Sequence, residues 1–341
     1  MGSSPPGFVR CWVAALVAAG LAAATAPVAS AATAEVHDYD LGRIDMPTPG
    51  PRGPIPVRLW GTIGMPVGPG PHPLVLVLHG RHGDNCPVGP GDAEVWPCFG
   101  RERRNDLGLR HVVRALAARG LVALAPDLNA AFTAGWGEPD DVRRWPRIVN
   151  RVLARVAREA RRGGGDFGVD LQGRVRLDRI GLLGHSISGH RAVRFARGPH
   201  GASVRALFLL APVFGRVALP DLPAAVVLGS CDGDTGTRGR RYLELARRAT
   251  GRRRRVFLAR LPGANHNYYN RTLARLGHDD APRRCRRRGR LRPRVQQRWL
   301  ERAAADFFAA TLRREPRPAW LRPGAPLPRR VYGLRVRVRR G

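Results

Sequence analysis

The sequence contains no lysine, and all 59 of its basic residues are arginine. Only 26 acidic residues balance them, which leaves a formal net charge of +33 over 341 residues. Use of arginine in place of lysine fits the coding bias of a high-GC genome, but that bias does not explain the shortage of acidic residues. Arginine-rich runs at residues 252–255 and 283–294 predict a strongly positive surface that attracts nucleic acid, anionic lipid or acidic wall polymers.

Other absences exclude several classes of partner. A specific nucleic-acid module needs a groove-reading element or a stacking platform, and the sequence shows neither, so we expect only nonspecific attraction to anionic surfaces. After the N-terminal region no segment is long and apolar enough to span a bilayer. No cysteine pair has the Cys-x2-Cys spacing that zinc sites favour. We therefore predict no transmembrane span, no metal and no cofactor.

The N-terminus has the pattern of a secretory signal peptide. Arg10 precedes an apolar run at residues 11–26, and Ala29-Ser30-Ala31 follows as a small-x-small cleavage site. The alternative, a membrane anchor, is less favoured because the run is shorter than the ~20 residues that a span needs. We expect residues 1–31 to be removed and a secreted, extracellular protein to begin near Ala32.

Cysteine is scarce, with five residues in the whole chain. One of them, Cys11, leaves with the signal peptide, so Cys86, Cys98, Cys231 and Cys285 remain for an oxidising compartment. Four cysteines allow three pairings. We favour Cys86 with Cys98, which brackets one loop, and Cys231 with Cys285, which ties two late loops together.

The hydrophobic pattern predicts an α/β fold. Residues 72–78 form a continuous apolar run, as a strand buried on both faces requires. Further predicted strands lie at 36–44, 55–63, 121–126, 175–183, 204–213, 224–229 and 256–261, and amphipathic helices alternate with them, the last at 295–312. This alternation predicts a mostly parallel sheet covered by helices on both faces.

The domain organisation follows from the same pattern. We expect one catalytic domain over residues 32–313, without a large helical cap because the 211–222 connection is short. Residues 314–341 form a Pro/Arg-rich C-terminal extension, in which 331–338 alternate apolar residues with arginine like an edge strand.

The segment 179–190 combines an apolar strand, a Gly-His-Ser turn and a small-residue helix start. This is the layout of a nucleophile elbow, in which a strained strand-to-helix turn lifts the hydroxyl of Ser186 above a sheet. Ser188 stands where a second glycine is usual. Because the chain contains 41 glycines, the motif needs the support of an acid, a histidine and oxyanion donors in the expected order.

Two later strands supply that support. The strand at 224–229 opens into a loop that contains Asp232, and the strand at 256–261 opens into a loop that contains His266. The order serine, acid, histidine is that of this kind of site. All three residues follow the carboxyl ends of predicted strands, where α/β sheets bind their ligands.

The identity of the acid stays open between two residues. We favour Asp232, three residues after the strand-ending Gly229, and keep Asp234 as the alternative. Either aspartate also suits the cap of a helix starting near Thr235, a role that fits Asp234 better. For the oxyanion hole we predict the backbone N–H groups of Ile187 and Arg81.

Four motifs together resemble the α/β-hydrolase superfamily over about residues 54–313. They are His79-Gly80-Arg81-His82, Gly184-His185-Ser186-Ile187-Ser188-Gly189, Cys231-Asp232-Gly233-Asp234 and Gly263-Ala264-Asn265-His266-Asn267. The chain is most similar to secreted bacterial hydrolases related to dienelactone-hydrolase-like and cutinase/polyesterase-like enzymes. The resemblance implies Ser186 as nucleophile, His266 as base and Asp232 as acid.

Three functional hypotheses follow. The first is an exported serine hydrolase that cleaves a small-molecule or polymeric carboxylic ester through an acyl-enzyme. The second keeps the same triad but transfers the acyl group to an envelope alcohol. The third is a non-catalytic, basic binding protein on a hydrolase scaffold, since this superfold hosts many functions. We favour the first because the triad residues occur in the expected order.

Overall fold

The computed structural model describes residues 1–2, 34–47, 53–82, 85–86, 96–98, 100–133, 141–248 and 255–340. Residues 32–341 form one compact unit. Apart from Met1 and Gly2, the predicted signal peptide lies outside the described residues, as does the arginine run at 252–254. No helix in the described part of the chain has the length and apolar character needed to cross a membrane.

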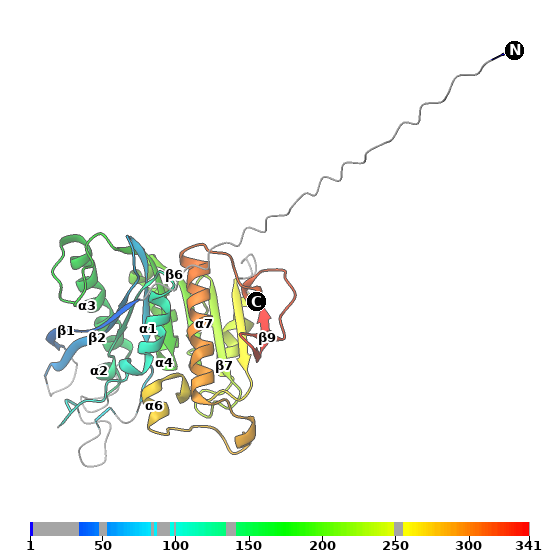
Figure 1. Cartoon of the computed structure of the whole chain (residues 1–341). Helices are drawn as coiled ribbons and strands as arrows, with labels where there is room; N and C mark the ends of the chain where they lie inside the picture. Colours follow the sequence, from blue (N-terminus) through cyan, green and yellow to red (C-terminus); the bar gives the residue numbers. More distant parts are fainter. Residues whose placement is uncertain are drawn as a thin grey trace. The chain divides into compact units, whose positions relative to one another are not determined.

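A large central sheet organises the described part of the chain (Figure 1). Its strands follow the order β1-β2-β4-β3-β5-β6-β7-β8-β11. Their bounds are β1 Glu35–Met46, β2 Ile55–Met65, β3 His72–Leu78, β4 Val122–Pro126, β5 Val175–His185, β6 Val204–Leu210, β7 Ala224–Gly229, β8 Val256–Leu261 and β11 Arg337–Arg340. The neighbours from β4 to β8 are parallel, whereas β1, β2 and β11 pair antiparallel. The predicted α/β class with a mostly parallel sheet is confirmed.

Helices cover both faces of this sheet. The α-helices are α1 Arg110–Ala117, α2 Asn129–Phe132, α3 Asp141–Arg162, α4 Ile187–Arg197, α5 Arg241–Arg248, α6 Arg271–Arg275 and α7 Pro293–Leu312. Short 3-10 helices are η1 Asp106–Leu109, η2 Pro199–Ser203, η3 Arg238–Arg240, η4 Asn267–Tyr269, η5 Arg287–Gly289 and η6 Ala319–Leu321. Side chains of α1 and α7 pack in one apolar cluster, and those of α3, α4 and α5 pack in another.

The packing of strand β3 explains the continuous apolar run at residues 72–78. Its Leu74, Leu76 and Leu78 side chains join the cluster with α3 and α4, whereas Val75 and Val77 join the cluster with α1 and α7. All five side chains are fully buried. Successive side chains of a strand point to opposite faces, so a strand between two helix layers must be apolar throughout.

The structure differs from the sequence prediction at three places. The strand predicted to reach residue 213 ends at Leu210, because Ala211 turns the chain with a φ of +44°. The helix expected near Thr235 begins only at Arg241, after the short η3. Between these two places, the connection from β6 to β7 at residues 211–223 forms neither helix nor strand, in agreement with the expectation of no large helical cap there.

The third difference lies in the C-terminal segment. The predicted edge strand at 331–338 is instead a small hairpin of β9 (Arg330–Val331) and β10 (Leu334–Arg335), followed by β11. The turn between β9 and β10 explains the break, because Tyr332 and Gly333 both have positive φ values. Strand β11 then pairs antiparallel with β8 and forms that edge of the sheet.

Candidate active site

Ser186 lies at the turn between β5 and α4, with φ +57° and ψ −125°. A serine in this region of backbone space is strained, and such strain persists only where the surrounding structure fixes it. The Ser186 N–H donates to the carbonyl of Leu210 at 2.9 Å, and the Val213 N–H donates to the Ser186 carbonyl at 3.1 Å. The neighbouring strand β6 and the loop after it therefore hold the turn that the elbow motif predicts.

Two glycines let other backbone segments approach this turn. A Cβ on Gly184 would lie 2.5 Å from the Ser188 carbonyl oxygen, which a real side chain would not tolerate. A Cβ on Gly80 would lie 2.7 Å from the Ser186 Cβ. The loop after β3 is therefore packed directly against Ser186.

Ser188 joins the elbow to that same loop. Its fully buried hydroxyl donates to the carbonyl of His79 at 2.5 Å and accepts a hydrogen bond from the indole of Trp145 at 2.9 Å. The sequence suggested only a small residue that replaces a glycine. In the structure the hydroxyl positions the β3 loop beside Ser186.

His79 fixes the other side of the β3 loop. Its Nε2 accepts from the Leu128 N–H at 2.7 Å, which places the proton on Nδ1, where it donates to the Gly80 carbonyl at 2.8 Å. Burial lowers the pKa of His79 to about 4, so the ring is neutral. His79 therefore acts as a positioning residue for the loop and not as a proton carrier.

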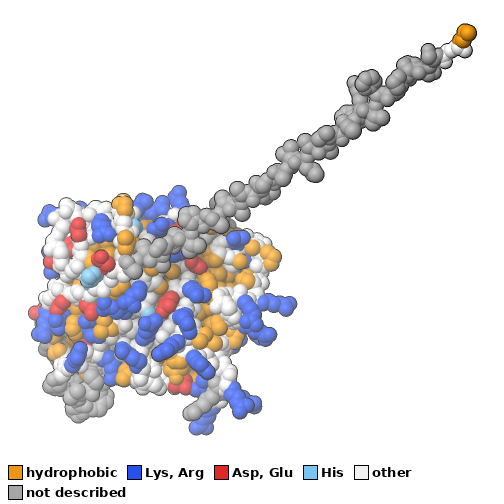
Figure 2. All heavy atoms as spheres, in the orientation of Figure 1, with side chains coloured by type: hydrophobic (Ala, Val, Ile, Leu, Met, Phe, Trp, Pro, Cys, Tyr) orange, Lys and Arg blue, Asp and Glu red, His pale blue; other side chains and the backbone are white. Residues whose placement is uncertain are grey.

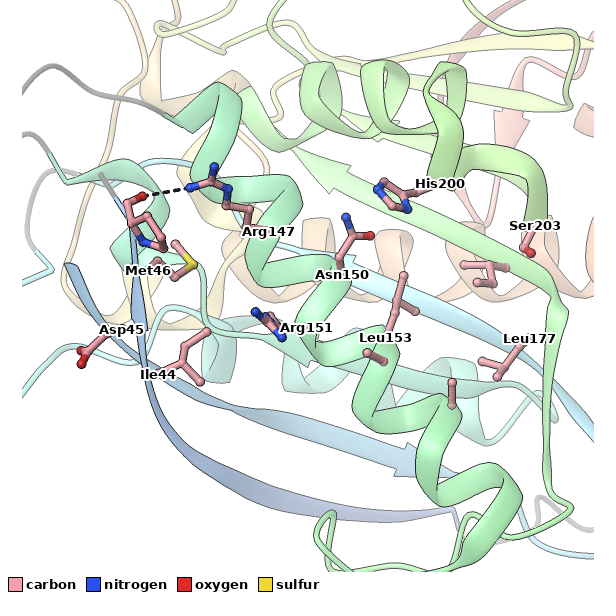
Figure 3. Close-up of a pocket in the computed structure, with 14 residues that line it drawn as sticks. Ile44, Asp45, Met46, Arg147, Asn150, Arg151, Leu153, Leu177, His200 and Ser203 are labelled. Carbon is pink, nitrogen blue, oxygen red and sulfur yellow. Dashed lines mark hydrogen bonds between the residues drawn. The ribbon is translucent and has the colours of Figure 1, made fainter. Parts of the chain in front are cut away.

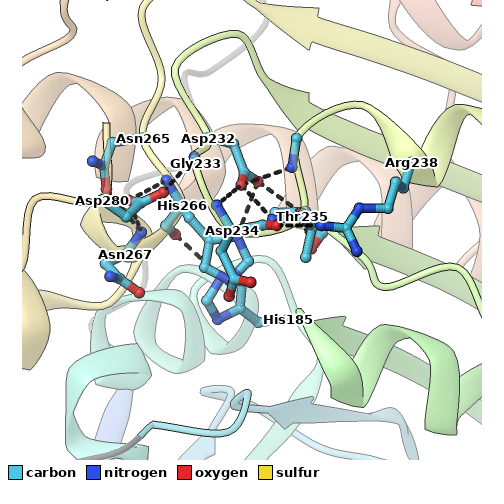
Figure 4. A network of polar contacts seen from close by, with 12 residues as sticks. His185, Asp232, Gly233, Asp234, Thr235, Arg238, Asn265, His266, Asn267 and Asp280 are labelled. Atoms are coloured by element: carbon cyan, nitrogen blue, oxygen red, sulfur yellow. Dashed lines mark hydrogen bonds and ion pairs between the residues drawn. The ribbon is translucent and has the colours of Figure 1, made fainter. Parts of the chain in front are cut away.

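His266 and Asp232 form a buried hydrogen-bonded pair (Figure 4). Nδ1 of His266 donates to Oδ2 of Asp232 at 2.9 Å. The Thr235 hydroxyl donates to the same oxygen at 2.8 Å, and three backbone N–H groups, of Asp234, Thr235 and Gly236, donate to Oδ1. Although burial alone would raise the pKa of Asp232, these hydrogen bonds outweigh it and the pKa is lowered. Asp232 is thus an ionised acceptor that orients the imidazole.

Asp234 lies at the opposite edge of the His266 ring. Its Oδ2 is 3.3 Å from Nε2 of His266, and its side chain is 61% exposed. Burial alone would lower the pKa of His266, but the hydrogen bond and charge of Asp232, with the charges of Asp234 and Asp280, raise it. The two candidate acids therefore differ in place: Asp232 contacts Nδ1 of His266, whereas Asp234 faces Nε2.

His185 connects the elbow with the His266 loop. Its ring centroid lies 4.6 Å from that of His266, and its Nε2 donates to the His266 carbonyl at 3.2 Å. Burial holds the pKa of His185 well below its ordinary value, so the ring is neutral. The Ser186 hydroxyl makes no hydrogen bond to any residue that the structure describes. Hydrogen bonds between nucleophile and base are often loose in ligand-free enzymes and tighten with substrate.

The predicted oxyanion donors flank Ser186. Ile187 is the first residue of α4, so its N–H has no acceptor within the helix. Arg81 directly follows Gly80, whose backbone is packed against Ser186. The two backbone groups thus lie on the elbow and on the loop that contacts it.

Two residues that the sequence did not single out hold the His266 loop. Asp280 accepts from the His266 N–H at 3.0 Å and from the Gly233 N–H at 2.7 Å, so it bridges the two loops of the site. Gln296, buried in α7, accepts from the Asn265 N–H at 3.0 Å and donates to the Asn265 carbonyl at 2.6 Å. Adjacent glutamines on the buried side of an amphipathic helix were the one available signal, whereas nothing marked Asp280.

Both favoured disulfides are present. Cys86 pairs with Cys98, and Cys231 pairs with Cys285 across 54 residues of sequence. Because Cys231 precedes Asp232, the second bridge ties the Asp232 loop to the chain between α6 and η5.

A separate groove of about 1030 Å³ lies between the end of β1, α3 and the first half of β5 (Figure 3). Arg147 at its rim donates to the Pro47 carbonyl at 2.9 Å. It contains none of the predicted site residues and includes Leu177 and Ile180, near the amino end of β5. Ligands of such sheets bind at the carboxyl ends of the strands, so this groove is not the candidate active site.

Among the described residues, no cluster of histidine, cysteine or carboxylate side chains has an arrangement that could hold a metal ion. No protein-family model matches the chain. A search of curated proteins finds no significant relative.

Proposed function

We propose that the protein is an exported serine hydrolase of the α/β-hydrolase superfamily that cleaves carboxylic esters. The observations that carry the proposal are the buried Asp232–His266 pair and the strained Ser186, which all follow the carboxyl ends of parallel strands in the central sheet. A serine hydroxyl needs a neighbouring base, and that base needs an orienting acid. The chain offers this set in the expected order.

In the proposed reaction Nε2 of His266 takes the proton of the Ser186 hydroxyl as Oγ attacks the ester carbonyl. The Ile187 and Arg81 N–H groups stabilise the oxyanion of the tetrahedral intermediate. As the intermediate collapses, the ester C–O bond breaks and His266 gives its proton to the leaving alcohol. Water, deprotonated by His266, then attacks the acyl-enzyme; the bond between the acyl carbon and Ser186 Oγ breaks, His266 returns the proton to Oγ, and the acid is released.

Two features bear on the substrate and the compartment. The connection at 211–223 contains no helix, which supports an open site suited to a small soluble ester or to an ester on a polymer. The two disulfides fit an oxidising compartment. Transfer of the acyl group to an alcohol would use the same residues, and product analysis with an added sugar or lipid acceptor separates the two reactions.

The test is labelling with a fluorophosphonate probe, together with hydrolysis of p-nitrophenyl esters of graded acyl length. Ser186→Ala should abolish labelling and lower kcat/KM by about 10³-fold or more. Ser203→Ala, in η2 beside the separate groove, is the matched control and should behave like the wild type. Persistent labelling of Ser186→Ala would remove Ser186 from the mechanism.

A further inference from the structure

An arginine-lined groove of about 1260 Å³ lies between α1, α6 and the first turns of α7. We call it the arginine groove. Seven arginines line it, against the single carboxylate of Asp38; they are Arg110, Arg114, Arg271, Arg275, Arg292, Arg294 and Arg298. Figure 1 shows these helices on the visible face of the molecule, and in the same orientation Figure 2 shows blue arginine side chains spread over that face. The groove concentrates positive charge at one place on the molecule.

Five of these seven arginines have no partner in the described part of the chain. Arg110 pairs with Asp38, and Arg271 pairs with Glu301 at 2.9 Å. The other five side chains are exposed and form no hydrogen bond or ion pair with any described residue. Elsewhere in the structure acidic residues pair with arginine, as Asp166 does with Arg155 and Arg158. The groove is therefore cationic by arrangement and not only through overall composition.

This arrangement is unfavourable for the isolated fold. Each helix presents two groove-lining arginines one turn apart: Arg110 and Arg114 on α1, Arg271 and Arg275 on α6, Arg294 and Arg298 on α7. Like charges at i and i+4 repel on a helix surface. In addition, the first turn of α7 contains no acidic residue, and Arg292 and Arg294 place positive charge at the helix end where the dipole disfavours it. A bound anion would relieve both repulsions.

The shape and the lining indicate which anion fits. The space is far larger than one phosphate, and its cations come from three helices, so an extended ligand with repeated negative charges uses it best. None of the lining residues is Phe, Tyr or Trp, and the ring of His111 is buried and hydrogen-bonded through both nitrogens, so the groove offers no exposed aromatic ring on which bases could stack. We propose that the arginine groove binds a flexible, phosphate-rich chain that carries no nucleobases.

The groove shares a helix with the candidate active site. Gln296 and Gln297, on the buried side of the same first turns of α7, hold the loop of His266 through Asn265 and Tyr268. A chain bound in the groove therefore lies against the elements that support that loop. The binding proposal itself does not depend on hydrolase activity, and Ser186→Ala should bind as the wild type does.

The test is binding of linear inorganic polyphosphate to the purified protein, measured by calorimetry over a range of salt concentrations. The groove variant replaces Arg114, Arg275, Arg294 and Arg298 with Gln. The matched control replaces Arg194, Arg248, Arg335 and Arg339 with Gln, which removes the same charge from exposed sites outside the groove. We expect Kd to rise at least about tenfold in the groove variant and less than about twofold in the control. The slope of log Kd against the logarithm of the salt concentration should be lower by about 3 in the groove variant than in the wild type.

Several outcomes overturn the proposal. Equal losses in the two variants would show a general surface field, and absence of measurable binding to the wild type would remove the site. Tighter, groove-dependent binding of a single-stranded oligonucleotide with the same number of phosphates would assign the groove to nucleic acid. Circular dichroism checks folding, and the single variant Arg275→Glu provides a second, less disruptive reduction of groove charge, with a several-fold rise in Kd expected.

Discussion

The first turns of α7 separate two regions that treat polar side chains in opposite ways. On the buried side, Gln296 makes two hydrogen bonds to Asn265 and so supports the loop of His266. On the exposed side, Arg294 and Arg298 line the arginine groove without a partner among the described residues. The same stretch of helix thus supports a hydrogen-bonded region on one side and, on the other, borders a groove in which most arginines have no partner among the described residues.

The difference follows from solvent. A buried polar atom without a partner costs about 1–3 kcal/mol, and the hydrogen bonds of Asp232, Asn265 and His266 avoid that cost and fix the geometry of the His266 loop. Exposed arginines keep their hydration, and repulsion between them is weakened by salt. The two regions also differ in sign, since Asp232, Asp234 and Asp280 surround His266 and raise its pKa in a protein of net charge +33. Close pairs, and not net charge, set the protonation of the candidate site.

The largest loss of activity is expected from a change at Asp232, which orients the ring of His266. Asp232→Asn keeps the shape but allows the amide to donate to Nδ1 of His266, which favours the wrong tautomer of the ring. We expect kcat/KM for a p-nitrophenyl ester to fall by about 10³- to 10⁴-fold, with polyphosphate binding unchanged. Asp221→Asn, an exposed aspartate, is the control. Wild-type activity in Asp232→Asn would show that the buried pair is structural only.

The Cys231–Cys285 disulfide tests how far the stability of the protein depends on the covalent bond next to Asp232. Cys231→Ala with Cys285→Ala frees a loop whose ends are 54 residues apart, and the chain-entropy treatment predicts a loss of about 4 kcal/mol in unfolding free energy. The Cys86–Cys98 bridge spans 12 residues, and the same treatment predicts a loss of about 3 kcal/mol. Urea unfolding measures both. A larger loss for the shorter bridge would contradict the loop-length argument.

The sequence predicted much of the fold because its strands lie between two helix layers. Such strands are apolar throughout, as in β3, and their loops follow the strand ends, so Ser186, Asp232 and His266 could be placed at one sheet edge. The prediction of one edge strand over residues 331–338 was wrong, because the alternation of apolar residues with arginine cannot reveal a turn in which Tyr332 takes a positive φ.

Other features were invisible because they depend on contacts between distant residues. Ser188 meets His79 across 109 positions, and Gln296 meets Asn265 across 31, so no local pattern reveals either contact. The arginine groove was hidden for a related reason. Composition shows many arginines, but only the packing of α1, α6 and α7 decides which of them converge.

A smaller effect is expected at Asp280, which bridges the Asp232 and His266 loops. Asp280→Asn replaces one accepting oxygen with a donor that faces a backbone N–H, of either Gly233 or His266. We expect an unfolding free energy lower by about 1–3 kcal/mol and a roughly tenfold lower kcat/KM. Asp178→Asn, whose carboxylate is exposed and paired with Arg176, controls for loss of a charge. Equal effects of the two substitutions would show that Asp280 does not position the Asp232 and His266 loops.

The smallest effect concerns pH and tests directly whether close pairs outweigh the arginine field. The raised pKa of His266 means that its base form, which the proposed reaction requires, predominates only above a pH higher than for an ordinary histidine. Asp234→Asn removes a carboxylate that stabilises the protonated ring, so the acid limb of the kcat/KM profile should move to lower pH.

The groove variant gives the opposite expectation if long-range charge matters. Removing four positive charges would then stabilise protonated His266 and move the acid limb to higher pH. If close pairs dominate, the groove variant leaves the acid limb in place, and only Asp234→Asn moves it. Because the Asp234 side chain is 61% exposed, added salt should weaken its contact and shift the wild-type profile toward that of Asp234→Asn. A shift of the acid limb in the groove variant but not in Asp234→Asn would show that the distant arginines, and not the close carboxylates, set the pKa of His266.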